Sequence, residues 1–409
     1  MLKIVTLLVL YFNNFGESTV LYAAVIYRHG DRTPVDTYPT DPWRNESLWP
    51  VKFGELTNIG KMQHYELGKW LRRRYVNLIS EEFDPSTVYV RSTDVDRTLM
   101  SAQANLAGMY PPTAKSMWNQ DIPWQPIPVH TIPENNDEVL AMKRKCKPYI
   151  EEKHKYINSK SYKERLSKYN DLMKYLTVNT LKKINDYEDI VSIYTTLKIE
   201  TLYNFTLPPW TRKVFPEAMR DPACYSFQTA TGTALMTRLM IGPLMQQIVN
   251  HMYDAVQEKP NHIKLSIYSG HDFTIGNILN GLGVYDGNCP EYTSTVFLEL
   301  IGNGSDHYIR LSYRNSARIV EPYVLSLPNC GKLCPLQQFT KLYDNIISVD
   351  WEKECREGSP VSWFVEFYFI LLLFLGILYA VSGILILKRR DKKLLRQSLA
   401  STQKRLFHQ

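Results

Sequence analysis

Residues 28–34 (RHGDRTP) place one histidine between two arginines. Each guanidinium presents a planar fork of N–H donors that suits the oxygens of a phosphate group. The imidazole of His29 keeps a neutral, nucleophilic fraction in mildly acidic water. Where arginines neutralise the phosphoryl oxygens, such an imidazole can attack phosphorus without a metal ion. The segment therefore predicts that Arg28 and Arg32 bind phosphate and that His29 is a nucleophile.

Two further parts of the chain supply what nucleophilic attack alone lacks. The pair His271-Asp272 offers a second imidazole for phosphate and a carboxyl group that can give a proton to the departing alkoxide. Arg97 falls in the first turn of a predicted helix, where anions are favoured. A His-Asp dipeptide alone is a weak signal, because most such pairs are structural. Together these residues indicate a phosphate-transfer site that uses no cofactor and no metal.

Both motifs follow runs of residues that are typical of buried strands. Residues 20–27 (VLYAAVIY) lead into the first motif, and residues 263–268 (IKLSIY) lead into the second. Ligands of α/β sheets bind outside the carboxyl ends of the strands, so we expect both motifs at one sheet edge. The other expected elements are a strand at 87–90, helices capped by Thr57 and by Asp94, and a helix at 274–282.

Residues 134–257 are rich in lysine and tyrosine and indicate several helices, including 162–176 and 232–256. We expect this segment to form a helical insert beside the sheet and one wall of the pocket. The predicted fold class is α/β, with a mostly parallel central sheet, flanking helices and the helical insert, followed by one C-terminal transmembrane helix.

The two ends of the chain indicate a membrane protein. Residues 1–18 have the pattern of a signal peptide, although a buried first strand is the alternative. Residues 367–387 carry no charge, and the roughly 20 residues that cross a bilayer fit a span at 363–387. Basic residues follow at once, so residues 388–409 are expected in the cytosol and residues 19–358 in the lumen or outside the cell. The predicted layout is a type I single-pass protein.

The net charge of +7 has a local origin. The tail beyond residue 387 holds eight lysines and arginines against one aspartate, which accounts for all of it. The remainder of the chain is neutral, so nucleic acid is not an expected partner.

The segment expected in the lumen also carries the signs of that compartment. Three sequons begin at Asn45, Asn204 and Asn303. All six cysteines lie there, and three disulfides are the economical interpretation, with 15 pairings open. A zinc site is not expected, because Cys330 and Cys334 have no second Cys or His pair.

Three stretches resemble one known family: RHGDRTP, RSTDVDRTLMSA at residues 91–102, and YSGHD at 268–272. They are similar to the histidine acid phosphatases of the lysosomal and prostatic type, over residues 20–355. The resemblance implies a phosphoglycerate mutase-like fold, and it is compatible with a homodimer. It also implies a role for each of six residues: His29 as the phosphate-accepting nucleophile, Arg28, Arg32, Arg97 and His271 as phosphate ligands, and Asp272 as the proton donor.

The membrane span resembles the lysosomal branch rather than the secreted prostatic one, which implies an endosomal or lysosomal membrane or the cell surface. The cysteines depart from the vertebrate pattern, which has a pair where this chain has Ile199 and Thr295. By resemblance, the disulfides join Cys146 to Cys355 and Cys330 to Cys334, which leaves Cys224 and Cys289 for each other.

Other interpretations remain open at this point. Within the same fold, a phosphomutase or a phytase shares the Arg-His-Gly core, although the His271-Asp272 pair favours hydrolysis of monoesters. A non-catalytic receptor ectodomain would fit the type I layout, but it would be expected to lack a catalytic residue. In the tail, residues 391–395 (DKKLL) resemble an acidic-dileucine sorting signal, and a positive membrane anchor with incidental leucines is the alternative.

Overall fold

The computed structural model describes residues 19–356 and 360–406. The expected signal peptide lies outside these residues. The chain divides into two compact units, one that ends at Cys355 and one that begins at Arg356. Each unit is described by itself.

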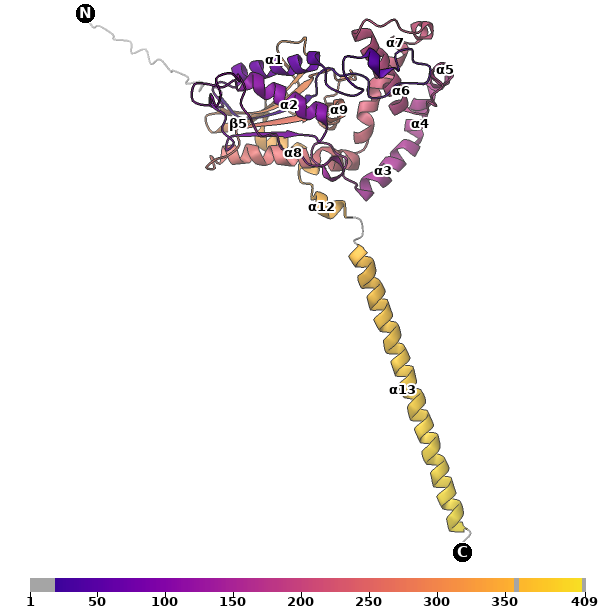
Figure 1. The fold of residues 1–409 in the computed structure, drawn as a ribbon. Helices are drawn as coiled ribbons and strands as arrows, with labels where there is room; N and C mark the ends of the chain where they lie inside the picture. The colour runs from indigo at the N-terminus through magenta and orange to yellow at the C-terminus, as the bar shows by residue number, and fades with distance from the viewer. Residues whose placement is uncertain (1–18, 357–359, 407–409) are drawn as a thin grey trace, which may run out of the picture. The chain divides into compact units, whose positions relative to one another are not determined.

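The first unit is built on one mixed sheet (Figure 1), with the strand order β2-β3-β1-β4-β5-β6, and β7 pairs with β5. Pairing is parallel between β1 and β3 and between β2 and β3, and antiparallel among the others. The expected α/β class is confirmed, but only the half of the sheet that carries the motifs is parallel. The strands are β1 (Thr19–Arg28), β2 (Val88–Ser92), β3 (Leu265–Gly270), β4 (Thr295–Asn303), β5 (Asp306–Arg314), β6 (Tyr323–Val324) and β7 (Cys334–Pro335).

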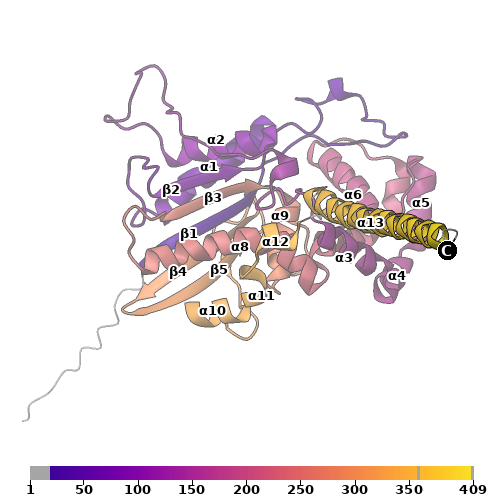
Figure 2. The ribbon, with the colours of Figure 1, turned by 90° about the horizontal axis from the view of Figure 1, so that it is seen from below.

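Helices cover both faces of this sheet, as Figures 1 and 2 show. Alternate side chains of β1 point to opposite faces. Ala23 and Val25 belong to the core under α1 (Asn58–Arg74) and α2 (Asp96–Met109), while Ala24 and Ile26 belong to the core under α8 (Ala234–Val256) and α9 (Asp272–Gly281). Burial on both sides explains why this strand is apolar throughout. Short helices α10 (Leu336–Leu342) and α11 (Asp344–Ile347) add to the α8 side.

The helical insert lies beside the sheet (Figure 1), and it has a hydrophobic core of its own. The expected helix at 162–176 is two helices, α4 (Lys160–Ser167) and α5 (Asn170–Thr180), because the chain turns at residues 168–169. The expected helix at 232–256 is α8, which packs on the sheet instead of in the insert. The insert contains α3 (Lys147–Asn158), α4 (Lys160–Ser167), α5 (Asn170–Thr180), α6 (Tyr187–Leu202) and α7 (Glu217–Tyr225). Short 3-10 helices lie at Glu46–Leu48, Glu134–Asn136, Pro209–Lys213 and Ser226–Thr231.

Two close approaches of backbone hold α1 in place. A Cβ atom at Gly68 would lie 1.9 Å from the carbonyl oxygen of Asn105, so α1 and α2 touch through their main chains. At the start of α1, a Cβ atom at Gly60 would lie 2.3 Å from the carbonyl oxygen of Asp31. Thr57 caps this end of the helix, as expected, by accepting from the N–H of Gly60. The first turn of α1 therefore rests directly on the loop that follows β1.

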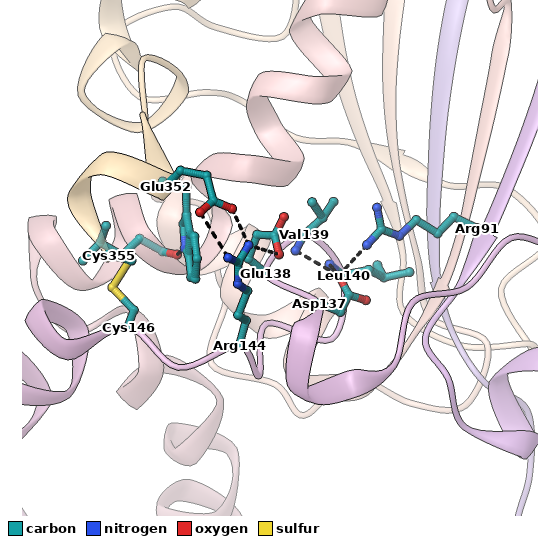
Figure 3. Close-up of polar contacts among 11 residues, drawn as sticks. Arg91, Asp137, Glu138, Val139, Leu140, Arg144, Cys146, Glu352 and Cys355 are labelled. Atoms are coloured by element: carbon teal, nitrogen blue, oxygen red, sulfur yellow. Dashed lines mark hydrogen bonds and ion pairs between the residues drawn. A yellow bond between two sulfur atoms is a disulfide. The ribbon is translucent and has the colours of Figure 1, made fainter. Parts of the chain in front are cut away.

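The structure contains three disulfides, Cys146–Cys355, Cys224–Cys289 and Cys330–Cys334. The first and the third are the pairs that the family resemblance implies, and the second joins the two cysteines that remained for each other. Figure 3 shows the first of them beside the ion pair between Arg144 and Glu352. Together the disulfide and the ion pair tie α12 (Trp351–Glu354) to the segment that precedes α3.

The second unit contains one long helix, α13 (Pro360–Leu406). Within it, the described segment Phe367–Gln397 contains an 18-residue stretch with a mean hydropathy of 2.8, which is long and apolar enough to cross a membrane. The expected span therefore lies on a continuous helix.

A carboxyl pair is buried where α6 meets the loop after β1. Glu200 is fully buried, and neither of its side-chain oxygens meets a hydrogen-bond donor among the described residues. Burial, and then the neighbouring charge of Asp41, raise the pKa of Glu200 to about 9. Burial also raises the pKa of Asp41, which Arg44 opposes, while the Tyr38 ring lies beside both carboxyl groups. One proton shared between the two carboxyl groups can pair one oxygen of each.

This pair predicts a stability that falls with rising pH. The folded pKa of Glu200 lies above its unfolded value of about 4.3, so its contribution is complete below that value and is lost as the pH rises toward 9. Between pH 5 and pH 7.5 the free energy of unfolding of the native protein should fall by on the order of 2–3 kcal/mol more than that of Glu200→Gln. Denaturant unfolding at both pH values measures this difference, with the exposed Glu217→Gln as the control. Parallel losses in native protein and Glu200→Gln would contradict it.

Candidate active site

The two motifs meet because β1 and β3 pair in parallel and end together. Arg28 lies opposite Gly270 in the register, and the backbone N–H of His29 donates to the Gly270 carbonyl at 3.0 Å. The rings of His29 and His271 are consequently 5.7 Å apart, edge to face. The expectation that both motifs lie at one sheet edge is confirmed.

His29 is held in one tautomer. Its Nδ1 lies 2.8 Å from the carbonyl oxygen of Gly30, so Nδ1 carries the proton and donates it. The lone pair of the neutral ring is then at Nε2. Burial, followed by the charges of Arg28, Arg32 and Arg97, lowers the pKa of His29 well below its usual range. A neutral imidazole with a free Nε2 is the form that can attack phosphorus, and these surroundings maintain it in acid.

Three guanidinium groups surround this imidazole. Arg28 contacts the Asp272 carboxylate at 2.9 Å and donates to the Pro290 carbonyl at 2.7 Å, and its guanidinium lies 4.5 Å from the centre of the Tyr292 ring. Burial, and then the charge of Arg32, lower the pKa of Arg97 to about 10. The Nε atoms of all three arginines are buried without a partner among the described residues. Unpaired buried donors of positive charge fit an anion of the size of phosphate.

His271 is also neutral and oriented. Its Nε2 lies 3.0 Å from the hydroxyl of Thr93, which lies 2.8 Å from the hydroxyl of Thr98. Thr98 donates to the carbonyl of Val95 at 2.7 Å, so Thr93 donates to Thr98 and accepts from His271. Burial and then Arg97 lower the pKa of His271 to about 3. The ring therefore offers a neutral Nε2–H donor.

Asp272 begins α9 and is ionised in this state. Burial raises its pKa, but the nearby Arg28 and Arg32 outweigh burial, and the pKa of Asp272 is lower than usual. Its Oδ1 accepts from the N–H of Phe273 at 2.9 Å. A carboxyl group in this position can give a proton to a leaving group only after its contact with Arg28 weakens.

The sequence interpretation missed several residues at this edge. Thr93 directly follows β2, so its position at a strand end was a usable signal. Tyr292, which packs on Arg28 and donates to the Arg32 carbonyl at 3.2 Å, lies in a loop and gives no such signal. Asp31 belongs to the first motif, yet its carboxylate accepts from Thr57 at 2.6 Å and from Tyr203 at 2.8 Å. It holds the loop in place instead of facing the arginines.

The site opens into a cavity of about 650 Å³ between the sheet edge and the insert. Tyr149 and Val191 of the insert line it, together with Arg97 and His271, so the insert forms one wall as expected. Part of the rim is the loop that follows residue 136. Asp137 orders this loop by accepting from the N–H groups of residues 139 and 140 at 3.0 and 2.9 Å and from Arg91, as Figure 3 shows.

Two other sequence predictions concern the glycosylation sequons and the metal ion. Asn45, Asn204 and Asn303 are all exposed. Among the described residues, histidine, cysteine and carboxylate side chains form no cluster that could hold a metal ion.

Comparisons with known proteins agree on one family. The model of the histidine phosphatase superfamily (branch 2) matches residues 19–314. A prostatic acid phosphatase of Bos taurus is 40% identical over 344 residues, which cover 82% of this chain and 87% of that protein. A lysosomal acid phosphatase of Xenopus laevis is 38% identical over 343 residues, covering 83% and 79%. The apo form of Hafnia alvei phytase, at 16% identity, has a TM-score of 0.60 and covers 84% of this chain and 99% of its own, which supports the fold alone. The chain therefore belongs to branch 2 of the histidine phosphatase superfamily.

Proposed function

We propose that this chain is an acid phosphatase that hydrolyses phosphate monoesters through a phosphohistidine at His29. Relatives named prostatic and lysosomal acid phosphatase support the activity, and a phosphohistidine mechanism is typical of the family. The observation that carries the assignment to His29 is its geometry. A neutral ring with Nε2 free is held among three arginines with unpaired donors.

In the first half of the reaction, Arg28, Arg32 and Arg97 bind the phosphoryl oxygens, and the Nε2–H of His271 turns from the Thr93 hydroxyl to donate to the phosphate. Nε2 of His29 attacks phosphorus while the bond to the ester oxygen breaks. Asp272 gives its proton to that oxygen, and the alcohol leaves. In the second half, water attacks the phosphohistidine, Asp272 takes the proton from the water, and the N–P bond breaks. Inorganic phosphate leaves and His29 is neutral again.

Binding of substrate prepares Asp272 for this role. In the free site Arg28 holds the carboxylate ionised. A phosphate group on Arg28 competes for the same guanidinium and brings negative charge beside the carboxylate, and both effects raise its pKa. Protonation of Asp272 in the complex is easiest at acid pH, at which His29 stays neutral because its own pKa is low. The two groups therefore have compatible charge states in acid.

The lysosomal relatives and the apolar helix α13 fit a lysosomal membrane protein. We propose the finer layout of a type I protein, with residues 19–358 in the lumen, a span at 363–387 and residues 388–409 in the cytosol. Basic residues after the span, exposed sequons and three disulfides support it. The homodimer that the family resemblance allows stays a prediction.

The nucleophile assignment predicts a covalent intermediate that depends on His29. Labelled substrate, mixed rapidly and quenched in alkaline denaturant, should leave label on the native protein and none on His29→Ala. Turnover should fall on the order of 10⁴-fold or more, as for the loss of other nucleophiles. His154→Ala, an exposed histidine on α3, serves as the control and should keep its label. Normal labelling of His29→Ala would remove this residue from the role.

The proton-donor assignment predicts how rates depend on the leaving group. A basic alkoxide needs a proton as it departs, whereas nitrophenolate leaves nearly unaided. Asp272→Asn should therefore lower kcat/KM for alkyl phosphates about 10²–10⁴-fold and lower it much less for nitrophenyl phosphate. A series of monoesters of rising leaving-group pKa measures how steeply kcat/KM depends on that pKa in the native protein and in Asp272→Asn. An equal loss across the series would mean that Asp272 only orients its neighbours.

The proposed layout predicts what a protease can reach. In sealed vesicles that carry the protein in its native orientation, added protease should remove only the segment beyond residue 387. Glycosidase should shift the mass of the protected fragment, and the shift should shrink in Asn45→Gln, Asn204→Gln or Asn303→Gln. Degradation of the large unit in intact vesicles would show that the orientation is the reverse of the one proposed.

A further inference from the structure

The side of the cavity on which the alcohol departs is set by the proposed chemistry. Attacking and leaving atoms lie roughly in line across phosphorus, so the ester oxygen faces away from His29 and toward its proton donor. The next residue after Asp272 is Phe273, on the first turn of α9. Its side chain is 36% exposed and lines the cavity. An apolar ring thus stands beside the place where the carbon part of the substrate must lie.

The Phe273 ring packs against a second, buried aromatic ring. The centroids of Phe273 and Phe227 are 4.8 Å apart, and Phe227 is only 3% exposed. Phe227 can approach α9 closely because Gly276 lies one turn after Phe273, and a Cβ atom at Gly276 would be 2.7 Å from the Cβ of Phe227. The buried ring limits the positions of the exposed one, which reduces the cost of ordering it around a substrate.

The cavity beyond the arginines offers little positive charge. Lys143 lines it and pairs with Glu134 at 2.6 Å. Lys153 also lines it and pairs with Glu188 at 3.4 Å. Apolar side chains, including Met142 and Met240, line the same space. The cavity therefore suits one phosphate group attached to a partly apolar body, and each of the two lysines that line it is already paired with a glutamate.

We propose that Phe273, seated on Phe227, binds the leaving group and gives the enzyme a preference for monoesters of aromatic alcohols over those of small polar or polyphosphorylated alcohols. The inference rests on the proposed function, since it assigns the residue that reads the alcohol in that same site. Phe273 is a specificity residue and takes no part in proton transfer.

The test uses the full-length chain in detergent with Phe273→Ala and with Phe273→Leu, which keeps apolar bulk without a ring. Aromatic contacts are worth about 0.5–1.5 kcal/mol beyond burial, so kcat/KM for 1-naphthyl phosphate should fall roughly tenfold in Phe273→Ala and less in Phe273→Leu. The loss should appear in KM. Glycerol 2-phosphate turnover and inhibition by inorganic phosphate should stay within about twofold, because neither uses the ring.

A matched control separates this effect from general loss of packing. Leu235→Ala truncates a side chain of a residue that is 38% exposed at the start of α8, and it should leave kcat/KM unchanged for both 1-naphthyl phosphate and glycerol 2-phosphate. Equal losses for naphthyl and glycerol esters in Phe273→Ala, or no loss for either, would overturn the inference. Turnover of inositol hexakisphosphate by the native protein that matches its turnover of 1-naphthyl phosphate would overturn it too. Native protein without activity on any monoester would instead refute the proposed function itself.

Discussion

The parallel pairing of β1 with β3 is the constraint on which the site depends. The two strands are more than two hundred residues apart in sequence, yet their register brings Arg28 opposite Gly270. Each strand then contributes the residue that follows it, and β2, paired with β3 on its other side, contributes Thr93 in the same way. A shift of the register by one residue would turn the β1 side chains to the opposite faces of the sheet and separate the two histidines. Burial of both faces of β1 makes such a shift costly.

The same edge concentrates positive charge that the fold does not fully neutralise. Asp272 offsets part of it through Arg28, and the Asp31 carboxylate is committed to Thr57 and Tyr203. The unpaired donors of the arginines remain buried, which costs stability and favours any anion that can reach them. Both histidines respond by staying neutral, because a further positive charge would add repulsion to the cost of burial. Readiness for phosphate and the protonation state of the imidazoles therefore have one physical cause.

The sequence was sufficient for the parts of the fold that local pattern determines. The strand before each motif and the Thr57 cap were predictable because apolar runs and side-chain caps act within a few residues. Asp94 was expected to cap α2, but the cap residue is Val95. The antiparallel half of the sheet was missed, although β4 and β5 are joined by a turn with Gly304 at a φ of +62°, a recognisable hairpin signal. Thr93 could have been noticed because it follows a predicted strand, whereas the contacts of Tyr292, which lies in a loop, depend on tertiary structure that a single sequence does not reveal.

Arg28 links the free state of the site to the chemistry proposed for it. In the free site its guanidinium is shared among the Asp272 carboxylate, the Pro290 carbonyl and the face of Tyr292. The last two contacts fix the position of the guanidinium whatever the carboxylate does, so phosphate can displace Asp272 without moving the arginine. The displaced carboxylate then lies beside a negative phosphate in a buried site, where it is favourable for it to take up a proton. In the proposed mechanism, phosphate binding to the fixed Arg28 thus favours the protonated form of Asp272, which is the acid that the leaving group needs.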